Sequence, residues 1–318
     1  MKFKINPRIF KPLNLYINSI HIGNRCPINN NGIFKSAKRI IAIGDIHGDF
    51  EVLLIALYKA KCIDLKGNWI GGKTVVIQLG DLLDRGGRGV SIETNNNREE
   101  LDILQFLEEI HRNAQIYGGA VYSVLGNHEL MNILGDFRYT TPNTLEGFGG
   151  SEIRKQLFQP GGKLAKQIAC HTYGIIQIGD WIFVHGGILP QHINSFSISE
   201  INSLVKNILL GNKNIDNLSQ EEYSLLMGEQ GIFWTRLLSS SVPDCQLVNK
   251  TMATLKLNNK NGGIVVGHTP QDGINGVCNK KLWKVDNGMS QAFGERYSMD
   301  KIQVLEIINN GASFNIIK

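Results

Sequence analysis

The 318 residues suffice for one large α/β domain or two small ones, each with a sizeable hydrophobic core. Hydrophobic residues make up 42% and charged residues 19%, which is typical of globular proteins and excludes an intrinsically disordered chain. The net charge of +5 is mild and no basic, aromatic-rich stretch occurs, so we expect no nucleic-acid partner. No apolar run is long enough to span a membrane, so we expect no membrane partner and a cytoplasmic protein.

The five cysteines are scattered along the chain, their number is odd, and they form no Cys-x-x-Cys pair. This pattern favours a reducing compartment over a disulfide framework. The cysteines are Cys26, Cys62, Cys170, Cys245 and Cys278.

Residues 1–38 form an N-terminal extension that contains lysine and arginine but no aspartate or glutamate. Pro7, Pro12 and Pro27 interrupt any regular pattern. Organellar targeting by residues 1–38 is one interpretation, since transit peptides are basic and poor in acidic residues. The segment has few serines, so we favour a strap that packs on the domain.

From residue 39 onward the pattern alternates between buried strands and amphipathic helices. We expect strands at 40–44, 74–79 and 121–125, with helices at 49–60 and 98–115 between them. Such alternation implies parallel strands, and the carboxyl ends of parallel strands lie side by side.

Each of these three strands ends in glycine followed by a polar cluster. The clusters are GDIHG (44–48), GDLLDRG (80–86) and GNHE (126–129). One such cluster could simply cap the next helix. Three in succession, each carrying residue types that bind metals, indicate a metal site at the carboxyl edge of the sheet.

The second half of the chain repeats this pattern of an apolar strand followed by a polar residue, after a change in composition. Residues 135–170 are rich in glycine and basic residues, and we expect a helical insertion there. His185 and His268 each follow an apolar strand. The remaining expected elements are strands at 173–178, 181–184 and 263–266, a helical stretch at 197–257, and two strands near 282–286 and 302–308 that close a second sheet.

The candidate ligands are too many for one tetrahedral zinc ion, which takes four. They suit two divalent ions that share a carboxylate, the usual clamp for in-line displacement at phosphorus. A hydroxide bridging both metals would be the nucleophile. Manganese is favoured, although these ligand types also accept iron or zinc. The candidate ligands are Asp45, His47, Asp81, Asn127, His185 and His268.

Other residues of the same clusters can serve the leaving group and the phosphate. His128 is placed to act as general acid, with Asp84 holding its tautomer. Arg85 and Arg236 are candidates for binding phosphate oxygens, to which Asn127 also lies close in the motif. We expect Glu129 to begin a helix rather than to contact substrate. His111 is expected on a solvated helix face.

As a set, these motifs resemble the phosphoprotein phosphatase branch of the calcineurin-like metallophosphoesterases. Five further stretches resemble the Shewanella-like protein phosphatases, and the similarity extends over roughly residues 40–308. They are GDFRY (135–139), VHGGILP (184–190), FWTR (233–236), GHTPQDGIN (267–275) and WKVDNGMS (283–290).

The resemblance implies a four-layer αββα sandwich, in which two mixed sheets are flanked by helices, over a catalytic domain at 39–318. It also implies roles for the site residues: Asp45, His47 and Asp81 on the first metal, Asp81, Asn127, His185 and His268 on the second, His128 with Asp84 as the acid pair, and Arg85 with Arg236 as the phosphate clamp.

Three functions remain open at this point. A protein phosphatase that hydrolyses phosphomonoesters on a phosphoprotein substrate is favoured. A dinucleoside tetraphosphate hydrolase would share the early motifs and cleave a phosphoanhydride instead. A non-catalytic scaffold predicts the loss of a ligand or of the acid, yet every position is filled. The sequence does not separate phosphoserine or phosphothreonine from phosphotyrosine, and it indicates no regulatory subunit.

Overall fold

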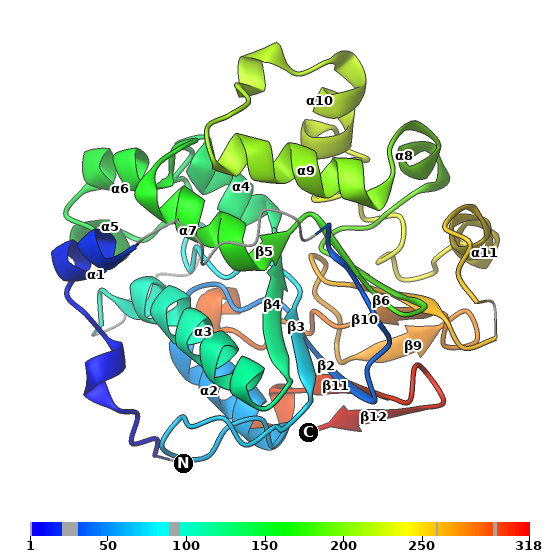
Figure 1. The fold of residues 1–318 in the computed structure, drawn as a ribbon, viewed down its shortest axis with the longest axis horizontal. Helices are drawn as coiled ribbons and strands as arrows, with labels where there is room; N and C mark the ends of the chain where they lie inside the picture. The colour runs from blue at the N-terminus through cyan, green and yellow to red at the C-terminus, as the bar shows by residue number, and fades with distance from the viewer. Residues whose placement is uncertain (1, 21–30, 89–95, 259, 295–297) are drawn as a thin grey trace.

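The computed structural model describes residues 2–20, 31–88, 96–258, 260–294 and 298–318. Two six-stranded mixed sheets pack face to face, and helices cover their outer faces (Figure 1). This architecture confirms the predicted four-layer αββα sandwich. Among the described residues, no helix is long and apolar enough to cross a membrane.

The first sheet has the strand order β12-β11-β2-β3-β4-β5. Strands β2 to β5 are parallel, while β11 runs antiparallel to both β2 and β12. Residues alternate along β2, so that Ile40 and Ala42 face the core between the sheets and Ile41 and Ile43 face the helices. The strands are β2 (Arg39–Ile43), β3 (Val75–Gln78), β4 (Ala120–Val124), β5 (Thr172–Tyr173), β11 (Val304–Ile308) and β12 (Ser313–Ile317).

The second sheet has the order β1-β6-β7-β8-β10-β9. Strands β7, β8 and β10 are parallel, whereas β6 and β9 are antiparallel to their neighbours β7 and β10. Trp181 and Phe183 of β7 fill the core between the sheets. The strands are β1 (Ile33–Phe34), β6 (Ile175–Ile178), β7 (Trp181–Val184), β8 (Gly263–Val266), β9 (Asn275–Val277) and β10 (Leu282–Lys284).

Helices α2, α3 and α7 lie beside the first sheet, and α8, α9 and α11 lie beside the second (Figure 1). Helix α2 begins where the Asp49 side chain accepts a hydrogen bond from the Val52 N–H, with Glu51 in its first turn. The helices are α1 (Leu13–Ser19), α2 (Phe50–Lys59), α3 (Glu99–Ile116), α4 (Asn127–Ile133), α5 (Pro142–Gly147), α6 (Ser151–Phe158), α7 (Lys163–His171), α8 (Pro190–Ser195), α9 (Ile198–Leu209), α10 (Gln220–Met227) and α11 (Cys245–Thr254). Short 3-10 helices lie at Pro7–Ile9, Ile215–Asn217, Gln291–Phe293 and Met299–Lys301.

Three expectations about the elements were wrong in part. The strand expected at 173–178 is divided at Gly174, because β5 belongs to the first sheet and β6 to the second. The strand near 302–308 pairs with β2 in the first sheet rather than closing the second. The helical stretch expected at 197–257 is interrupted between α10 and α11.

The described part of the N-terminal extension packs on the domain. Phe10 makes an edge-on contact with Phe50 of α2, and the buried Tyr16 donates from its hydroxyl to Glu108 of α3 at 3.2 Å. Strand β1 then adds to the edge of the second sheet beside β6. Residues 21–30, including Cys26, lie outside the described residues.

A disulfide joins Cys245 at the start of α11 to Cys278 in the turn between β9 and β10. The two cysteines are 33 residues apart in sequence, with Cα atoms 5.3 Å apart. The expectation that the cysteines stay reduced was therefore wrong for this pair. No short cysteine motif in the sequence predicts this disulfide, because the tertiary fold brings the two segments together.

Candidate active site

The residues that carry chemical function lie on loops that follow parallel strands. Strands β2, β3 and β4 are parallel in one sheet, and β7 and β8 are parallel in the other. Their carboxyl ends meet at one rim, where open α/β sheets bind ligands. The buried residues there are Asp45 and His47 after β2, Asp81 and Asp84 after β3, Asn127 and His128 after β4, His185 after β7 and His268 after β8.

Two groups of histidine and aspartate share one carboxylate, that of Asp81. The ligand atoms of His47, Asp81 and His128 lie within 4.8 Å of one another, as do those of Asp81, His185 and His268. Asp81 Oδ2 is 3.8 Å from His47 Nε2 and 3.3 Å from His185 Nε2. A carboxylate between two sets of imidazoles suits two divalent ions that share a ligand.

Asp45 and Asn127 extend this donor set. Asp45 Oδ2 is 4.0 Å from His47 Nε2, and Asn127 Oδ1 is 2.9 Å from His185 Nε2. Burial raises the pKa of Asp45 well above its ordinary value, and the carboxylates of Asp286 and Asp81 raise it further. Buried carboxylates that raise one another's pKa repel one another unless a cation lies among them. The residues present therefore fit divalent metal ions, and all six predicted ligands meet at this site.

Several of these residues have left-handed backbone conformations. The φ angles are +45° at His47, +52° at Asp81, +70° at Asp84 and +68° at His268. Residues other than glycine rarely adopt this backbone conformation. Its occurrence at several residues of the site indicates tight turns that direct their side chains toward one point. The backbone of Gly126 lies close against the Asp81 side chain, and a Cβ at this position would be 2.2 Å from Asp81 Oδ1.

His128 is held from behind by Asp84, with Nδ1 3.0 Å from Asp84 Oδ2. Its other ring nitrogen, Nε2, therefore lies on the side of the metal-ligand groups. Burial opposes protonation, but the carboxylates of Asp81 and Asp84 hold the pKa of His128 above its ordinary value. This environment favours an imidazolium with a proton on Nε2 that it can donate.

Asp84 is itself fixed by residues that the sequence did not single out. Its carboxylate accepts from the Thr140 hydroxyl at 2.7 Å and from the Asn132 amide at 2.9 Å. Its backbone N–H donates to Glu100 Oε1 at 2.8 Å, and Glu100 Oε2 pairs with Arg154 at 2.7 Å. A buried chain of contacts thus runs from Arg154 in the insertion to the acid pair.

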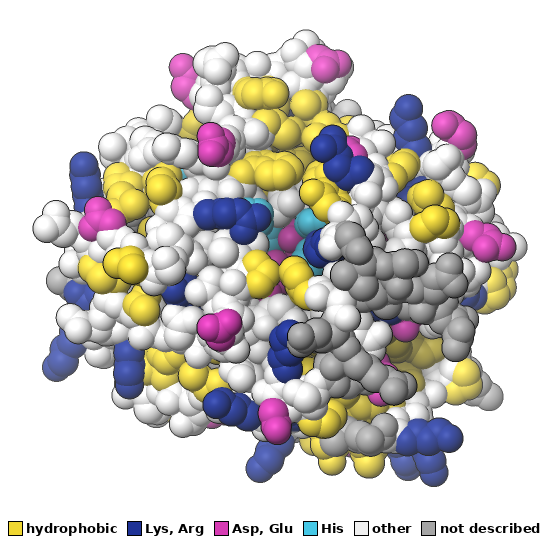
Figure 2. All heavy atoms as spheres, turned by 180° about the vertical axis from the view of Figure 1, so that it is seen from behind, with side chains coloured by type: hydrophobic (Ala, Val, Ile, Leu, Met, Phe, Trp, Pro, Cys, Tyr) yellow, Lys and Arg dark blue, Asp and Glu magenta, His cyan; other side chains and the backbone are white. Residues whose placement is uncertain are grey.

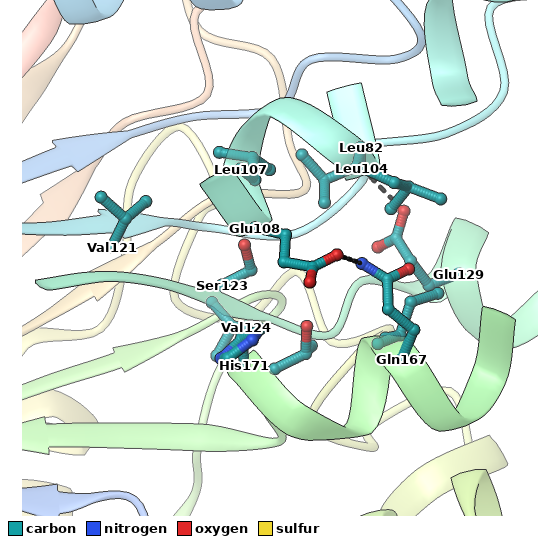
Figure 3. Close-up of a pocket in the computed structure, with 12 residues that line it drawn as sticks. Leu82, Leu104, Leu107, Glu108, Val121, Ser123, Val124, Glu129, Gln167 and His171 are labelled. Carbon is teal, nitrogen blue, oxygen red and sulfur yellow. Dashed lines mark hydrogen bonds between the residues drawn. The ribbon is translucent and has the colours of Figure 1, made fainter. Parts of the chain in front are cut away.

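Glu129 is a structural residue of the same loops, as predicted. Its carboxylate accepts hydrogen bonds from the backbone N–H groups of Gly126, Asp81, Leu82 and Leu83 at 2.8–3.1 Å. Figure 3 shows this side chain at one end of a small cavity of about 30 Å³ between α3, β4 and α7. That volume is enough for a single water molecule. Glu129 therefore fixes the turn that carries the shared ligand Asp81.

A much larger cavity, of about 670 Å³, opens over the metal-ligand groups. Figure 2 shows histidine and acidic side chains at the centre of one face, with basic and apolar side chains around them. The aromatic residues Tyr139, Trp234 and Phe293 line this cavity, together with Arg88 and Arg236. Its volume is typical of a site for a small organic ligand or a large side chain.

Of the two arginines predicted to bind phosphate, Arg236 lines this cavity and Arg85 does not. Arg85 is only 5% exposed, and its guanidinium pairs with Glu99 at 2.6 Å and with Asp49 at 3.5 Å. The structure therefore places Arg236, but not Arg85, beside this cavity. Arg88 lies in the cavity instead, and it was missed because it falls outside the GDLLDRG motif.

His111 also differs from expectation. It is buried on α3, with Nδ1 2.6 Å from the carbonyl oxygen of Val121 on the neighbouring strand β4, and is not on a solvated face. Asp136 and Arg138 form an ion pair, with a separation of 2.7 Å, at the edge of the large cavity.

Comparison with known proteins agrees with this geometry. Residues 38–294 match the family model described as calcineurin-like phosphoesterase. The chain is 33% identical to Shewanella-like protein phosphatase 2 of Arabidopsis thaliana over 81% of this chain and 73% of that one. It is 31% identical to Shewanella-like protein phosphatase 1 of Plasmodium berghei over 79% of this chain and 67% of that one.

A solved structure has the same fold. The cold-active protein-tyrosine phosphatase of a psychrophilic Shewanella species superimposes with a TM-score of 0.70, covering 90% of this chain and 82% of that one, at 23% identity. Fold, ligand geometry and sequence relationship agree, and the chain belongs to the calcineurin-like phosphoesterases and, within them, to the Shewanella-like protein phosphatases.

Proposed function

We propose that this chain is a metal-dependent protein phosphatase that hydrolyses phosphotyrosine in preference to phosphoserine or phosphothreonine. The main support for a phosphatase reaction is the pair of histidine–aspartate groups that share Asp81 beneath the large cavity. Both relatives named above are protein phosphatases by name, which supports a phosphoprotein as substrate.

The metal ligands we propose are Asp45, His47 and Asp81 for one ion and Asp81, Asn127, His185 and His268 for the other. Two divalent ions at such a site supply positive charge to the phosphoryl oxygens and lower the pKa of a water molecule. We propose manganese for the activity in vitro, because imidazole, carboxylate and amide ligands all accept it.

His128 supplies the proton for the leaving oxygen. Its Nε2 lies 3.9 Å from Asp81 Oδ2, so the proton is held beside the proposed shared ligand. Asp84 fixes the ring orientation through Nδ1 and favours the charged form. Arg236 also lines the cavity, where its Nη1 donates to the His268 carbonyl and the Thr269 hydroxyl, each at 3.0 Å. Its remaining donors serve phosphate oxygens.

The preference for phosphotyrosine rests on the shape and lining of the cavity. Tyr139, Trp234 and Phe293 surround the space above the metal-ligand groups, and Met131 and Met227 add apolar surface. A phosphotyrosine ring in this cavity packs against the aromatic side chains that line it, with a gain of about 0.5–1.5 kcal/mol for each good ring pair. A phosphoserine side chain leaves that surface without a partner.

The test is hydrolysis by purified, manganese-loaded protein of peptides that differ only in the phosphorylated residue, with diadenosine tetraphosphate run alongside. We expect kcat/KM for the phosphotyrosine peptide to exceed that for the phosphoserine peptide by about tenfold or more. Asp81→Asn is the inactive control. A preference for phosphoserine or phosphothreonine would overturn the specificity, and hydrolysis of the dinucleotide alone would overturn the assignment as a protein phosphatase.

A further inference from the structure

Three side chains contact the carboxylate of Asp84 at hydrogen-bond distance. Its Oδ2 atom lies 3.0 Å from His128 Nδ1 and accepts from the Asn132 amide at 2.9 Å. Its Oδ1 atom accepts from the Thr140 hydroxyl at 2.7 Å. All of these side chains are buried, so water does not compete freely for the carboxylate. The orientation of Asp84 behind His128 therefore depends on the donors that hold its two oxygens.

Thr140 reaches Asp84 because the chain that follows α4 folds against the turn that carries Asp84. The N–H of Gly86 donates to the carbonyl oxygen of Tyr139 at 2.8 Å and joins the two segments. The N–H of Thr140 donates to the carbonyl oxygen of Phe137 at 2.9 Å and closes a tight turn before the hydroxyl. These backbone hydrogen bonds bring together two side chains that are 56 residues apart in sequence.

The residue before Thr140 contacts the other member of the acid pair. The ring of Tyr139 meets the His128 ring edge-on, with the ring centres 4.9 Å apart, and both side chains line the large cavity. Two successive residues of the insertion thus hold the acid pair, one at the imidazole ring and one at the carboxylate behind it.

A competing partner for the same carboxylate oxygen lies close by. Arg154 Nη2 is 3.7 Å from Asp84 Oδ1 and pairs with Glu100 Oε2 at 2.7 Å. A charged donor attracts a carboxylate more strongly than a hydroxyl does. Without the hydroxyl of Thr140, Oδ1 would turn toward Arg154 and weaken the contact of Oδ2 with His128. The hydroxyl satisfies Oδ1 with a neutral donor, so the negative charge of Asp84 remains beside the imidazole.

We propose that Thr140 is a positioning residue for proton donation by His128. Its hydroxyl holds Asp84 in the orientation that fixes the imidazole, so that Nε2 faces the leaving oxygen. Thr140 itself does not contact the substrate and acts through Asp84. The inference rests on the proposed phosphatase reaction and on His128 as the acid, but not on the preference for phosphotyrosine.

The first experiment compares phenyl phosphate with p-nitrophenyl phosphate as substrates of the manganese-loaded protein. The two substrates are similar in shape, but phenolate is the more basic leaving group and needs the proton from His128. Thr140→Val keeps the branched shape and loses the hydroxyl. We expect its kcat/KM to fall by about 10- to 100-fold for phenyl phosphate and by at most about threefold for p-nitrophenyl phosphate.

Thr140→Ser keeps the hydroxyl, and we expect it to recover most of the activity on phenyl phosphate. Equal losses on the two substrates in Thr140→Val would show a general structural effect and overturn the proposal. Activity of Thr140→Ser as low as that of Thr140→Val would also overturn it, because the hydroxyl would then not be the group that matters.

Thr141→Val is the matched control, because it removes the hydroxyl of the next residue. Thr141 caps α5, where its Oγ1 accepts from the Thr144 N–H at 3.1 Å. We expect this variant to have a lower Tm but a ratio of the two kcat/KM values within about twofold of the wild type. A change in this ratio as large as that in Thr140→Val would contradict a specific role for Thr140.

A second measurement needs no substrate. The proton on Nδ1 of His128 is observed by NMR in the zinc-loaded protein, since zinc is diamagnetic, and is assigned by its absence in His128→Asn. We expect this proton to exchange with water much faster in Thr140→Val than in the wild type and in Thr140→Ser. Equal exchange in all three proteins would overturn the proposal. A wild-type protein that hydrolyses neither aryl phosphate would instead overturn the proposed phosphatase function.

Discussion

Arg154 is expected to be among the most sensitive positions of the helical insertion. Its side chain is fully buried and pairs with Glu100 Oε2 at 2.7 Å, while its Nε donates to Asn132 Oδ1 at 2.8 Å. The rings of Phe148 and Phe158 lie 4.6 and 4.9 Å from its Cζ atom. Arg154→Met keeps much of the volume and removes the charge, together with the ion pair to Glu100, the longer one to Asp84 at 3.7 Å and the hydrogen bond to Asn132.

The expected cost follows from the carboxylate that is left behind. Glu100 is 2% exposed and faces Asp84, so without Arg154 it becomes a buried charge with a like charge nearby. Removing one partner of a buried pair costs about 3–5 kcal/mol. The entropy of unfolding is about 2.1 cal/mol/K per residue, so in a chain of 318 residues each kcal/mol lowers Tm by about 1.5 °C. The predicted fall in Tm is therefore about 5–8 °C.

The assay is thermal unfolding of the wild type, Arg154→Met, Glu100→Gln and the double variant. The double variant should be more stable than Arg154→Met alone, because it leaves no buried charge without a partner. A fall in Tm below about 2 °C in Arg154→Met would refute the reasoning. Strictly additive effects of the two substitutions would also refute it, since they would show that the two groups do not interact.

Three further predictions concern the acid, the turn and the response to pH. His128→Asn should keep its metal content and lose far more activity on alkyl phosphates than on p-nitrophenyl phosphate, whose leaving group needs no proton; equal losses would argue against His128 as the acid. Glu129→Gln places an amide N–H₂ against backbone N–H donors, so we expect it to lose stability and manganese affinity together, and wild-type values of both would contradict this role. Burial, with the charge of His111 adding to it, lowers the pKa of His171 to about 3. As the pH falls from 6.5 toward 3, the free energy of unfolding decreases by up to about 1.4 kcal/mol per pH unit, because the unfolded chain binds a proton at this histidine and the folded chain does not. His171→Gln should make the free energy of unfolding, measured in urea, less dependent on pH in this range. The same pH dependence in the variant and the wild type would contradict this prediction.

The sequence predicts the loops of this site well because each is short and follows a strand. Asp45, Asp81 and Asn127 come directly after glycine at a strand end, so strand order alone places them together. The insertion is different, since nothing near Arg154 in sequence indicates that it reaches Glu100, 54 residues away.

Other differences have the same physical origin. Residues 173–178 contain one tyrosine and three isoleucines, and only the packing of two sheets decides that the chain changes sheet at Gly174. Cys245 and Cys278 meet because α11 and the turn between β9 and β10 lie side by side. Arg85 and Arg88 are chemically identical, and which one faces the cavity depends on the carboxylates of Asp49 and Glu99 beside the first.

The left-handed turns at His47, Asp81, Asp84 and His268 have a consequence for how this protein can change. Each costs roughly 1–2 kcal/mol relative to glycine, which adopts the same backbone conformation without a penalty. Glycine would remove this backbone cost at four positions that we propose for metal binding and for the acid pair. A copy of this fold released from catalysis could become more stable by losing its site, so a screen for improved variants must select for activity as well as for Tm.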